Sequence, residues 1–270
     1  MRIYGVDFTS APCKRKPITV AAGTPKGKSL VLNGIENLVD FAAFEEFLRR
    51  PGPWIGGFDF PFGLAREAIV DLTWPADWNK LLLHCQAFGR AEFKNLLDAY
   101  RKTRPAGRRY ARRAGDIASG AHPSVKFVNP PVAYMFLEGA TRLAAAQLHI
   151  PGLNATPDKS RIALEAYPGM LVRRQVGIRA SYKSDTRSKH TPARKAVRKR
   201  ILGELLAGRP LGIRLVATAS LQKSMIDDGS GDLLDAAICA VQACWGWQKR
   251  DRNFGLPAQV DPLEGWIVSA

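Results

Sequence analysis

Several acidic residues of this chain fall where a predicted strand ends or a predicted helix begins. Asp7 and Asp59 each close a short apolar run, and Glu165 closes an alternating one. Asp232 and Asp235 are three residues apart at the start of an apolar stretch, which places both on one face of a helix's first turn. Carboxylates brought together at such ends oppose one another's ionisation unless a cation lies between them. The pattern therefore predicts a site for a hard divalent cation, Mg²⁺ or Mn²⁺.

A carboxylate site of this kind is suited to phosphodiester chemistry. Two divalent ions about 4 Å apart can activate the attacking water and stabilise the leaving oxygen. Asp7 would bridge the two ions, while Asp59 and Asp235 would each complete one ion's ligands. Glu165 would position water or support the ligands, and Asp232 would be a further member of the site. All five acids are thus candidate catalytic residues, and the first three are candidate metal ligands.

The two strand-end aspartates also have explanations that need no metal. Asp7 could cap the turn formed by Thr9 and Ser10, because a strand-end aspartate before a turn is common. Asp59 precedes Phe60 and could accept hydrogen bonds from backbone amides at the start of the next helix. Both explanations stay open on the sequence alone.

The other acids have similar alternatives. Glu165 could form an ordinary ion pair with Arg173 or Arg174. Asp232 and Asp235 could be helix N-terminal acids, which the helix dipole favours. One such residue would mean little, but acids at the ends of separate core elements favour a shared site.

Positive charge is the strongest feature of the composition. The chain carries 40 Lys and Arg against 24 Asp and Glu, a net charge of +16. Residues 101–113 hold seven basic side chains and no acid, and residues 173–200 hold eleven opposed only by Asp185. Such clusters need either solvent or a polyanion, and a nucleic-acid phosphate backbone is the usual partner. The candidate nucleic-acid contacts are Arg108, Arg109, Lys183, Arg194, Lys195 and Arg198.

The elements that must position the acids follow from the apolar pattern. Three strands joined by tight turns, an antiparallel meander, are predicted at 2–8, 17–22 and 28–32. A helix at 35–49 and a buried strand at 54–59 follow. The crossover rule places the later strand parallel to the first, so that Asp7 and Asp59 lie at the same edge of the sheet. This order of elements is how ribonuclease H-like folds begin.

The rest of the chain continues this plan. Residues of about 72–150 read as a helical insertion, with helices at 78–101 and 132–148 separated by the basic stretch 104–124. A strand within 160–168, helices at 193–207 and 232–247, and a final short strand at 265–269 complete the prediction. With 270 residues, 46% of them hydrophobic, the chain is predicted to form one α/β domain over 1–270.

Four motifs resemble one known family. They are Gly-Val-Asp7, Phe-Asp59-Phe-Pro-Phe-Gly, Glu165-Ala-Tyr-Pro and Asp232-Leu-Leu-Asp235-Ala-Ala-Ile-Cys-Ala. They resemble the family called domain of unknown function 429, whose members are described as predicted nucleases with a ribonuclease H-like fold related to Holliday-junction resolvases. The resemblance implies a three-layer fold with a mixed central sheet, and metal-binding positions at Asp7, Asp59 and Asp235. The chain departs from the resolvase pattern at Asp59, where those enzymes tend to use Glu, and the shorter side chain alters the metal spacing.

Three functions fit these features. The leading hypothesis is a metal-dependent nuclease acting on DNA or RNA, and the second is a nucleic-acid-binding protein without catalysis. The third is an actin-like ATP phosphotransferase, since the segment from Gly5 to Ser10 resembles a first phosphate loop, although a second such loop is not found. No apolar run approaches the roughly 20 residues of a membrane helix and the N-terminus lacks a signal-peptide pattern, so a cytoplasmic protein is expected. An edge strand leaves room for a homodimer.

Overall fold

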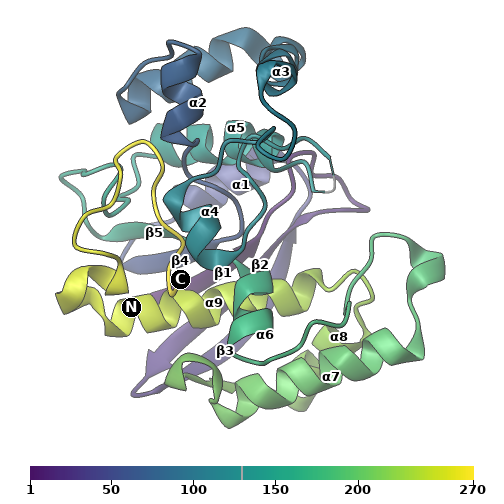
Figure 1. Ribbon diagram of the computed structural model, residues 1–270. Helices are drawn as coiled ribbons and strands as arrows, with labels where there is room; N and C mark the ends of the chain where they lie inside the picture. Colours follow the sequence, from purple (N-terminus) through teal and green to yellow (C-terminus); the bar gives the residue numbers. More distant parts are fainter. Residues whose placement is uncertain (129) are drawn as a thin grey trace.

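The central feature of the fold is a mixed β-sheet. The computed structural model describes residues 1–128 and 130–270 (Figure 1). Within them, a six-stranded sheet has the order β5-β4-β1-β2-β3-β6. The strands are β1 (Arg2–Asp7), β2 (Ile18–Lys26), β3 (Ser29–Leu38), β4 (Trp54–Phe58), β5 (Arg161–Glu165) and β6 (Arg214–Val216). The first three form an antiparallel meander, whereas β4 lies parallel to β1, β5 parallel to β4, and β6 parallel to β3.

Helices connect these strands and cover the sheet. They are α1 (Phe41–Leu48), α2 (Arg66–Asp71), α3 (Trp78–Thr103), α4 (Ala114–Ser119), α5 (Val132–Ala145), α6 (Pro168–Arg174), α7 (Pro192–Ala207), α8 (Ala219–Asp227) and α9 (Asp232–Gln248). Short 3₁₀ turns lie at Arg187–Lys189, Pro210–Gly212 and Arg250–Gly255. Helix α9 runs along one face of the sheet, with α7 and α8 beside it (Figure 1).

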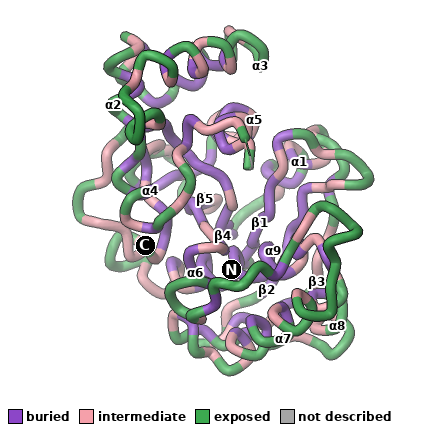
Figure 2. Tube along the Cα trace, turned by 45° about the vertical axis from the view of Figure 1, so that its right-hand side comes forward, coloured by how far each residue is buried: buried purple, intermediate pink, exposed green. Residues whose placement is uncertain are grey.

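Two hydrophobic cores, one on each face of the sheet, make the fold three-layered. Side chains alternate along β1: Ile3 packs into the core beneath α9, whereas Tyr4 and Val6 pack into the core beneath α1, α3 and α5. In β4, Ile55 joins the α9 core and Phe58 joins the other. Figure 2 shows β1, β4 and most of α9 as buried, with exposed residues along α7 and α8. The predicted α/β class with a mixed central sheet is confirmed.

Helix α9 approaches the sheet unusually closely at two glycines. A Cβ atom built on Gly5 of β1 would lie 2.0 Å from the Ala236 carbonyl oxygen. One built on Gly57 of β4 would lie 2.5 Å from the Cys239 carbonyl oxygen. Because real Cβ atoms cannot come so near, only glycine at these positions allows the first turns of α9 to rest on the strand backbones.

Several predicted elements have other bounds in the structure, and the strands expected at 17–22 and 28–32 extend to Lys26 and Leu38. The helix expected at 35–49 begins only at Phe41, because β3 pairs with β2 as far as Leu38. Asp40 then caps the helix, accepting a 2.8 Å hydrogen bond from the Ala43 amide. The strand expected at 265–269 forms only an isolated bridge between Ile267 and Glu165.

The segment between β4 and β5 carries the helices predicted for it. Helix α3 extends two residues past the expected end, and α5 ends three residues before it. The basic stretch between them contains α4, which the sequence did not predict. The single-domain boundaries themselves stay a prediction. No helix among the described residues combines the length and apolar character that a membrane crossing requires.

Candidate metal centre

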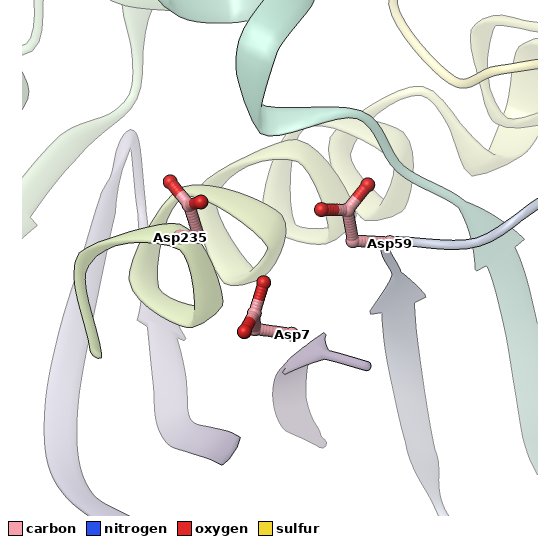
Figure 3. A group of neighbouring side chains, drawn as sticks. All are labelled: Asp7, Asp59 and Asp235. Carbon is pink, nitrogen blue, oxygen red and sulfur yellow. The ribbon is translucent and has the colours of Figure 1, made fainter. Parts of the chain in front are cut away.

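Three aspartates from three different elements meet at one edge of the sheet. Asp7 is the last residue of β1, Asp59 follows β4 directly, and Asp235 lies in the first turn of α9. One carboxylate oxygen from each lies within 4.8 Å of the others. The three side chains point toward a common space in Figure 3. The predicted convergence of these acids is confirmed.

Strand register explains why the aspartates meet. Gly5 of β1 lies opposite Gly57 of β4, and both face α9. Side chains alternate along a strand, so Asp7 and Asp59, each two residues further on, continue on the α9 side. The close approach of α9 at the two glycines then brings Asp235 to the same edge.

Burial and mutual repulsion raise the pKa values of the two strand-end carboxyls. Asp7 is only 7% exposed. Burial is the main cause that raises its pKa well above the usual range, and the charges of Asp232, Asp235 and Asp59 raise it further. Burial likewise raises the pKa of Asp59 to about 7, with further contributions from Asp235 and Glu165 that Lys183 opposes. The positive charge nearby therefore does not offset the cost of ionising these two carboxyls.

The hydrogen bonds at the site fall on one aspartate only. Asp235 is fully buried, and its Oδ1 accepts a 2.6 Å hydrogen bond from the Tyr182 hydroxyl. Its Oδ2 accepts from the Lys183 ammonium in a short ion pair. In the described part of the chain, no hydrogen bond reaches the carboxylate of Asp7 or Asp59. The turn after β1 is instead capped by Thr9, whose hydroxyl accepts from the Ala11 amide.

A second ion-pair group adjoins the three converging aspartates, Asp7, Asp59 and Asp235, which we call the triad. The Lys16 ammonium donates to Asp232 at 2.8 and 3.0 Å and to Asp185 at 2.7 Å. These carboxylates raise the pKa of Lys16 despite its burial, which acts in the opposite direction. Asp232 thus lies beside the triad, as predicted for a further site member, but its charge is already paired with a lysine.

Glu165 has a different environment from the triad. Both of its oxygens accept hydrogen bonds from the guanidinium of Arg113, at 2.6 and 2.8 Å, and one also accepts from the Phe62 amide at 2.9 Å. Arg113 is 2% exposed and also donates to Asp116 at 2.8 and 3.1 Å and to the Glu264 carbonyl at 2.9 Å. We call Arg113, Asp116 and Glu165 the arginine cluster.

The partner expected for Glu165 is therefore wrong. Neither Arg173 nor Arg174 pairs with it, and Arg113 from the basic stretch between α3 and α4 does. The register gives the reason: Glu165 lies opposite Phe58, one residue before Asp59. Because one residue changes the face of a strand, Glu165 points away from α9 and toward the inserted segment. Its predicted role in catalysis stays a prediction.

The candidate nucleic-acid contacts lie in different environments. Arg108 and Arg109 are exposed, Arg194 is half-buried, and Lys195 pairs with Asp227 at 2.5 Å. The prediction that Arg198 contacts a nucleic acid is wrong. Arg198 is 3% exposed and its guanidinium donates to the carbonyls of Ile226 and Tyr182 at 2.8 and 2.7 Å, so it joins the end of α8 to the segment of Tyr182 and has almost no surface for a phosphate.

The remaining candidate, Lys183, pairs with Asp235, and its side chain is 42% exposed. Its contact with a nucleic acid stays a prediction. Asp7 and Asp59 open into a cavity of about 690 Å³, whose charged lining also includes Lys16, Arg173 and Arg179. The sequence analysis did not single out Lys16 or Tyr182. Lys16 lies outside both long basic runs, and its one local signal is the basic triplet Lys14-Arg15-Lys16.

The residues of the triad fit a divalent cation. Mg²⁺ and Mn²⁺ prefer oxygen ligands, and two of the three carboxylates carry no competing hydrogen bond in the described chain. A cation would also relieve the repulsion that raises the pKa of Asp7 and Asp59. The protein matches no family model, no curated protein and no solved structure in comparisons with each.

Proposed function

We propose that this protein is a divalent-metal-dependent nuclease that hydrolyses phosphodiester bonds in DNA or RNA. The observation that carries the proposal is the convergence of Asp7, Asp59 and Asp235, with ligand atoms within 4.8 Å of one another at a cavity. Mg²⁺ or Mn²⁺ would be held by these three carboxylates. When bound, such an ion lowers the pKa of water and stabilises charge on a phosphate oxygen.

We also propose that the fold is ribonuclease H-like. The antiparallel meander β1-β2-β3, followed by α1 and then by β4 parallel to β1, is the order of elements with which that fold begins. The motifs that resemble the domain of unknown function 429 lie at the ends of β1, β4 and β5 and at the start of α9. The resemblance and the topology thus support the same fold and the same site.

The residues around the triad have distinct tasks in this proposal. Asp7 and Asp59 offer unoccupied oxygens toward the cavity. Tyr182 fixes the rotamer of Asp235 through its hydroxyl. Lys16, Arg173 and Arg179 line the cavity and would attract the phosphates of the substrate backbone. In this proposal the three aspartates bind the metal, and the basic residues Lys16, Arg173 and Arg179 bind the substrate.

Substitution of Asp7 tests the proposal. Asp7→Asn should abolish Mg²⁺- or Mn²⁺-dependent cleavage of labelled DNA and RNA oligonucleotides while leaving oligonucleotide binding intact. Asp251→Asn, at a side chain that is 85% exposed, is the matched control and should cleave like the wild type. Unchanged cleavage by the Asp7→Asn variant would reject the assignment.

The second candidate is a nucleic-acid-binding protein without catalysis. The pairing of Lys183 with Asp235 favours it, because an ammonium already compensates part of the triad's charge. Calorimetric titration with Mn²⁺ separates the two candidates. Saturable binding that Asp7→Asn removes supports the nuclease, whereas the absence of any saturable binding supports the non-catalytic protein.

A further inference from the structure

The Lys183 ammonium pairs directly with one of the three carboxylates of the triad. It contacts Oδ2 of Asp235, the oxygen that the Tyr182 hydroxyl leaves free. Its positive charge also acts on Asp7 and Asp59. The lysine is therefore a counter-ion of all three carboxylates, and not only the partner of one.

The backbone around Lys183 is held on both sides. The carbonyl of Tyr182 accepts from the buried guanidinium of Arg198 at 2.7 Å. The amide of Ser184 donates to the Gly229 carbonyl at 3.2 Å. The aliphatic stem of Lys183 packs on Gly231, where an added Cβ would lie 2.6 Å from the lysine Cβ. Since these contacts fix the stem, the ammonium is a built part of the site.

Charge balance then limits how many metal ions the triad can take. Three carboxylates and one ammonium leave a charge of −2, and two of the carboxylates, those of Asp7 and Asp235, are buried. One divalent ion neutralises this charge, whereas a second would leave a net positive charge with no described acid free to balance it. The nearby acids Asp232 and Asp185 are already paired with Lys16. Unbalanced charge in a buried site is costly.

We propose that the triad holds one divalent ion and not two, with the Lys183 ammonium fixed in the position of the second cation. This inference rests on the proposed function of the site as a metal centre. Lys183 would then act directly on the substrate, by donating a hydrogen bond to a phosphate or leaving oxygen beside the ion. An ammonium offers such a donor but cannot lower the pKa of a bound water as a metal does.

Counting bound Mn²⁺ tests the proposal without relying on cleavage. Calorimetric titration of the wild type should give one Mn²⁺ per chain, with the electron paramagnetic resonance spectrum of an isolated ion. Lys183→Met, which removes the charge and keeps the stem, should take two Mn²⁺ with a spectrum broadened by their coupling at about 4 Å. Lys183→Arg, which restores a cation, should return the count to one. Lys189→Met, at an exposed lysine of the same segment, is the control and should behave like the wild type.

The possible outcomes separate this inference from the proposed function. Two coupled Mn²⁺ in the wild type, or the same count in the wild type and Lys183→Met, would overturn the role of Lys183 and leave a metal centre in place. Binding by Lys183→Met alone would also overturn it, because the ion and the ammonium must be held together. No Mn²⁺ bound by either protein would remove the proposed metal centre itself.

Discussion

The triad and the arginine cluster are neighbouring groups of acids that differ in their hydrogen-bond partners. In the arginine cluster, Arg113 donates to both Asp116 and Glu165, and its guanidinium hydrogen bonds are satisfied within the protein. In the triad, Asp235 alone is hydrogen-bonded, and its cation Lys183 has a side chain that is 42% exposed. Both carboxylates of the first group have a guanidinium partner, whereas two of the three triad carboxylates have no hydrogen-bond partner among the described residues.

This difference distinguishes acids that support the fold from acids that are candidates for binding a ligand. A buried carboxylate paired in two places, such as Glu165, contributes to structure and has little capacity left for a metal. A carboxylate such as Asp59, whose pKa is raised to about 7, is costly to keep ionised and is therefore a candidate for function. Proximity to the sheet edge does not distinguish the two cases, but the hydrogen-bond partners do.

The largest effect is expected from breaking the arginine cluster. Arg113→Met leaves two buried carboxylates without a partner and should lower the free energy of unfolding by about 4 kcal/mol. Denaturant titration measures this loss. Arg109→Met, at an exposed arginine of the same basic stretch, should change stability little. Equal stability of the two variants would show that the cluster is not a structural ion pair.

Metal addition should affect the triad and not the cluster. Mn²⁺ at one hundred times its dissociation constant should stabilise the wild type by about 2.7 kcal/mol, because the ion binds only the folded chain. Thermal unfolding with and without Mn²⁺ measures the gain. Asp7→Asn should lose it, and Glu165→Gln should keep it. A gain that depends on Glu165 and not on Asp7 would reverse the assignment of the two groups.

Removing charge from the triad should stabilise the metal-free protein. The folded-state pKa of Asp59 is about 7 against an ordinary value of 3.8, so the folded chain binds more protons than the unfolded chain between these values. The free energy of unfolding therefore falls as the pH rises from about 4 to about 7. Asp59→Asn should remove this fall and add about 2 kcal/mol at pH 8, a figure reduced from the full shift because Asp59 is partly exposed.

Denaturant titration in a metal chelator at several pH values checks this expectation. The gain should disappear below about pH 4, where the carboxyl is protonated in both states. A gain that is the same at every pH would mean that Asp59 acts through its shape and not through its charge.

The smallest effect is expected at the exposed end of the basic stretch. Arg108 and Arg109 face solvent, whereas Arg113 of the same stretch is buried. Changing both exposed arginines to Gln should weaken oligonucleotide binding by about tenfold or less and reduce the salt dependence by about two charges. Fluorescence anisotropy across salt concentrations measures both quantities, with Arg252→Gln as the control. An unchanged salt slope would exclude these arginines from the interface.

Much of the fold could be predicted because its signals are local. The meander, β4, the long helices and the start of α9 follow from apolar period and turn residues, and the placement of Asp7 and Asp59 at one edge of the sheet follows from strand direction. The start of α1 was missed because residues 35–38 also fit a helical period, and pairing with β2 decides otherwise. The short β6 has too few residues to show a period.

The charge partners could not be predicted because they are not local. Arg113 lies 52 residues from Glu165 in the chain, and Lys16 lies 216 residues from Asp232. The direction in which the Glu165 side chain points could have been predicted from the sequence. Ile162 and Leu164 point to one face of β5, so Glu165 points to the other. The burial of Arg198 had one signal, its position beside the apolar residues Val197 and Ile201 on the predicted helix.

The contact of α9 with Gly5 and Gly57 sets how far apart the acids stand. Any side chain at Gly5 or Gly57 would push α9 away from the sheet. The absence of side chains at these glycines therefore sets the separation of Asp235 from Asp7 and Asp59. A methyl group added at Gly5 would force α9 away from β1. It would move Asp235 away from Asp7 and Asp59 without replacing any charged residue, so a position outside the site would set the size of the cation that the three carboxylates could hold.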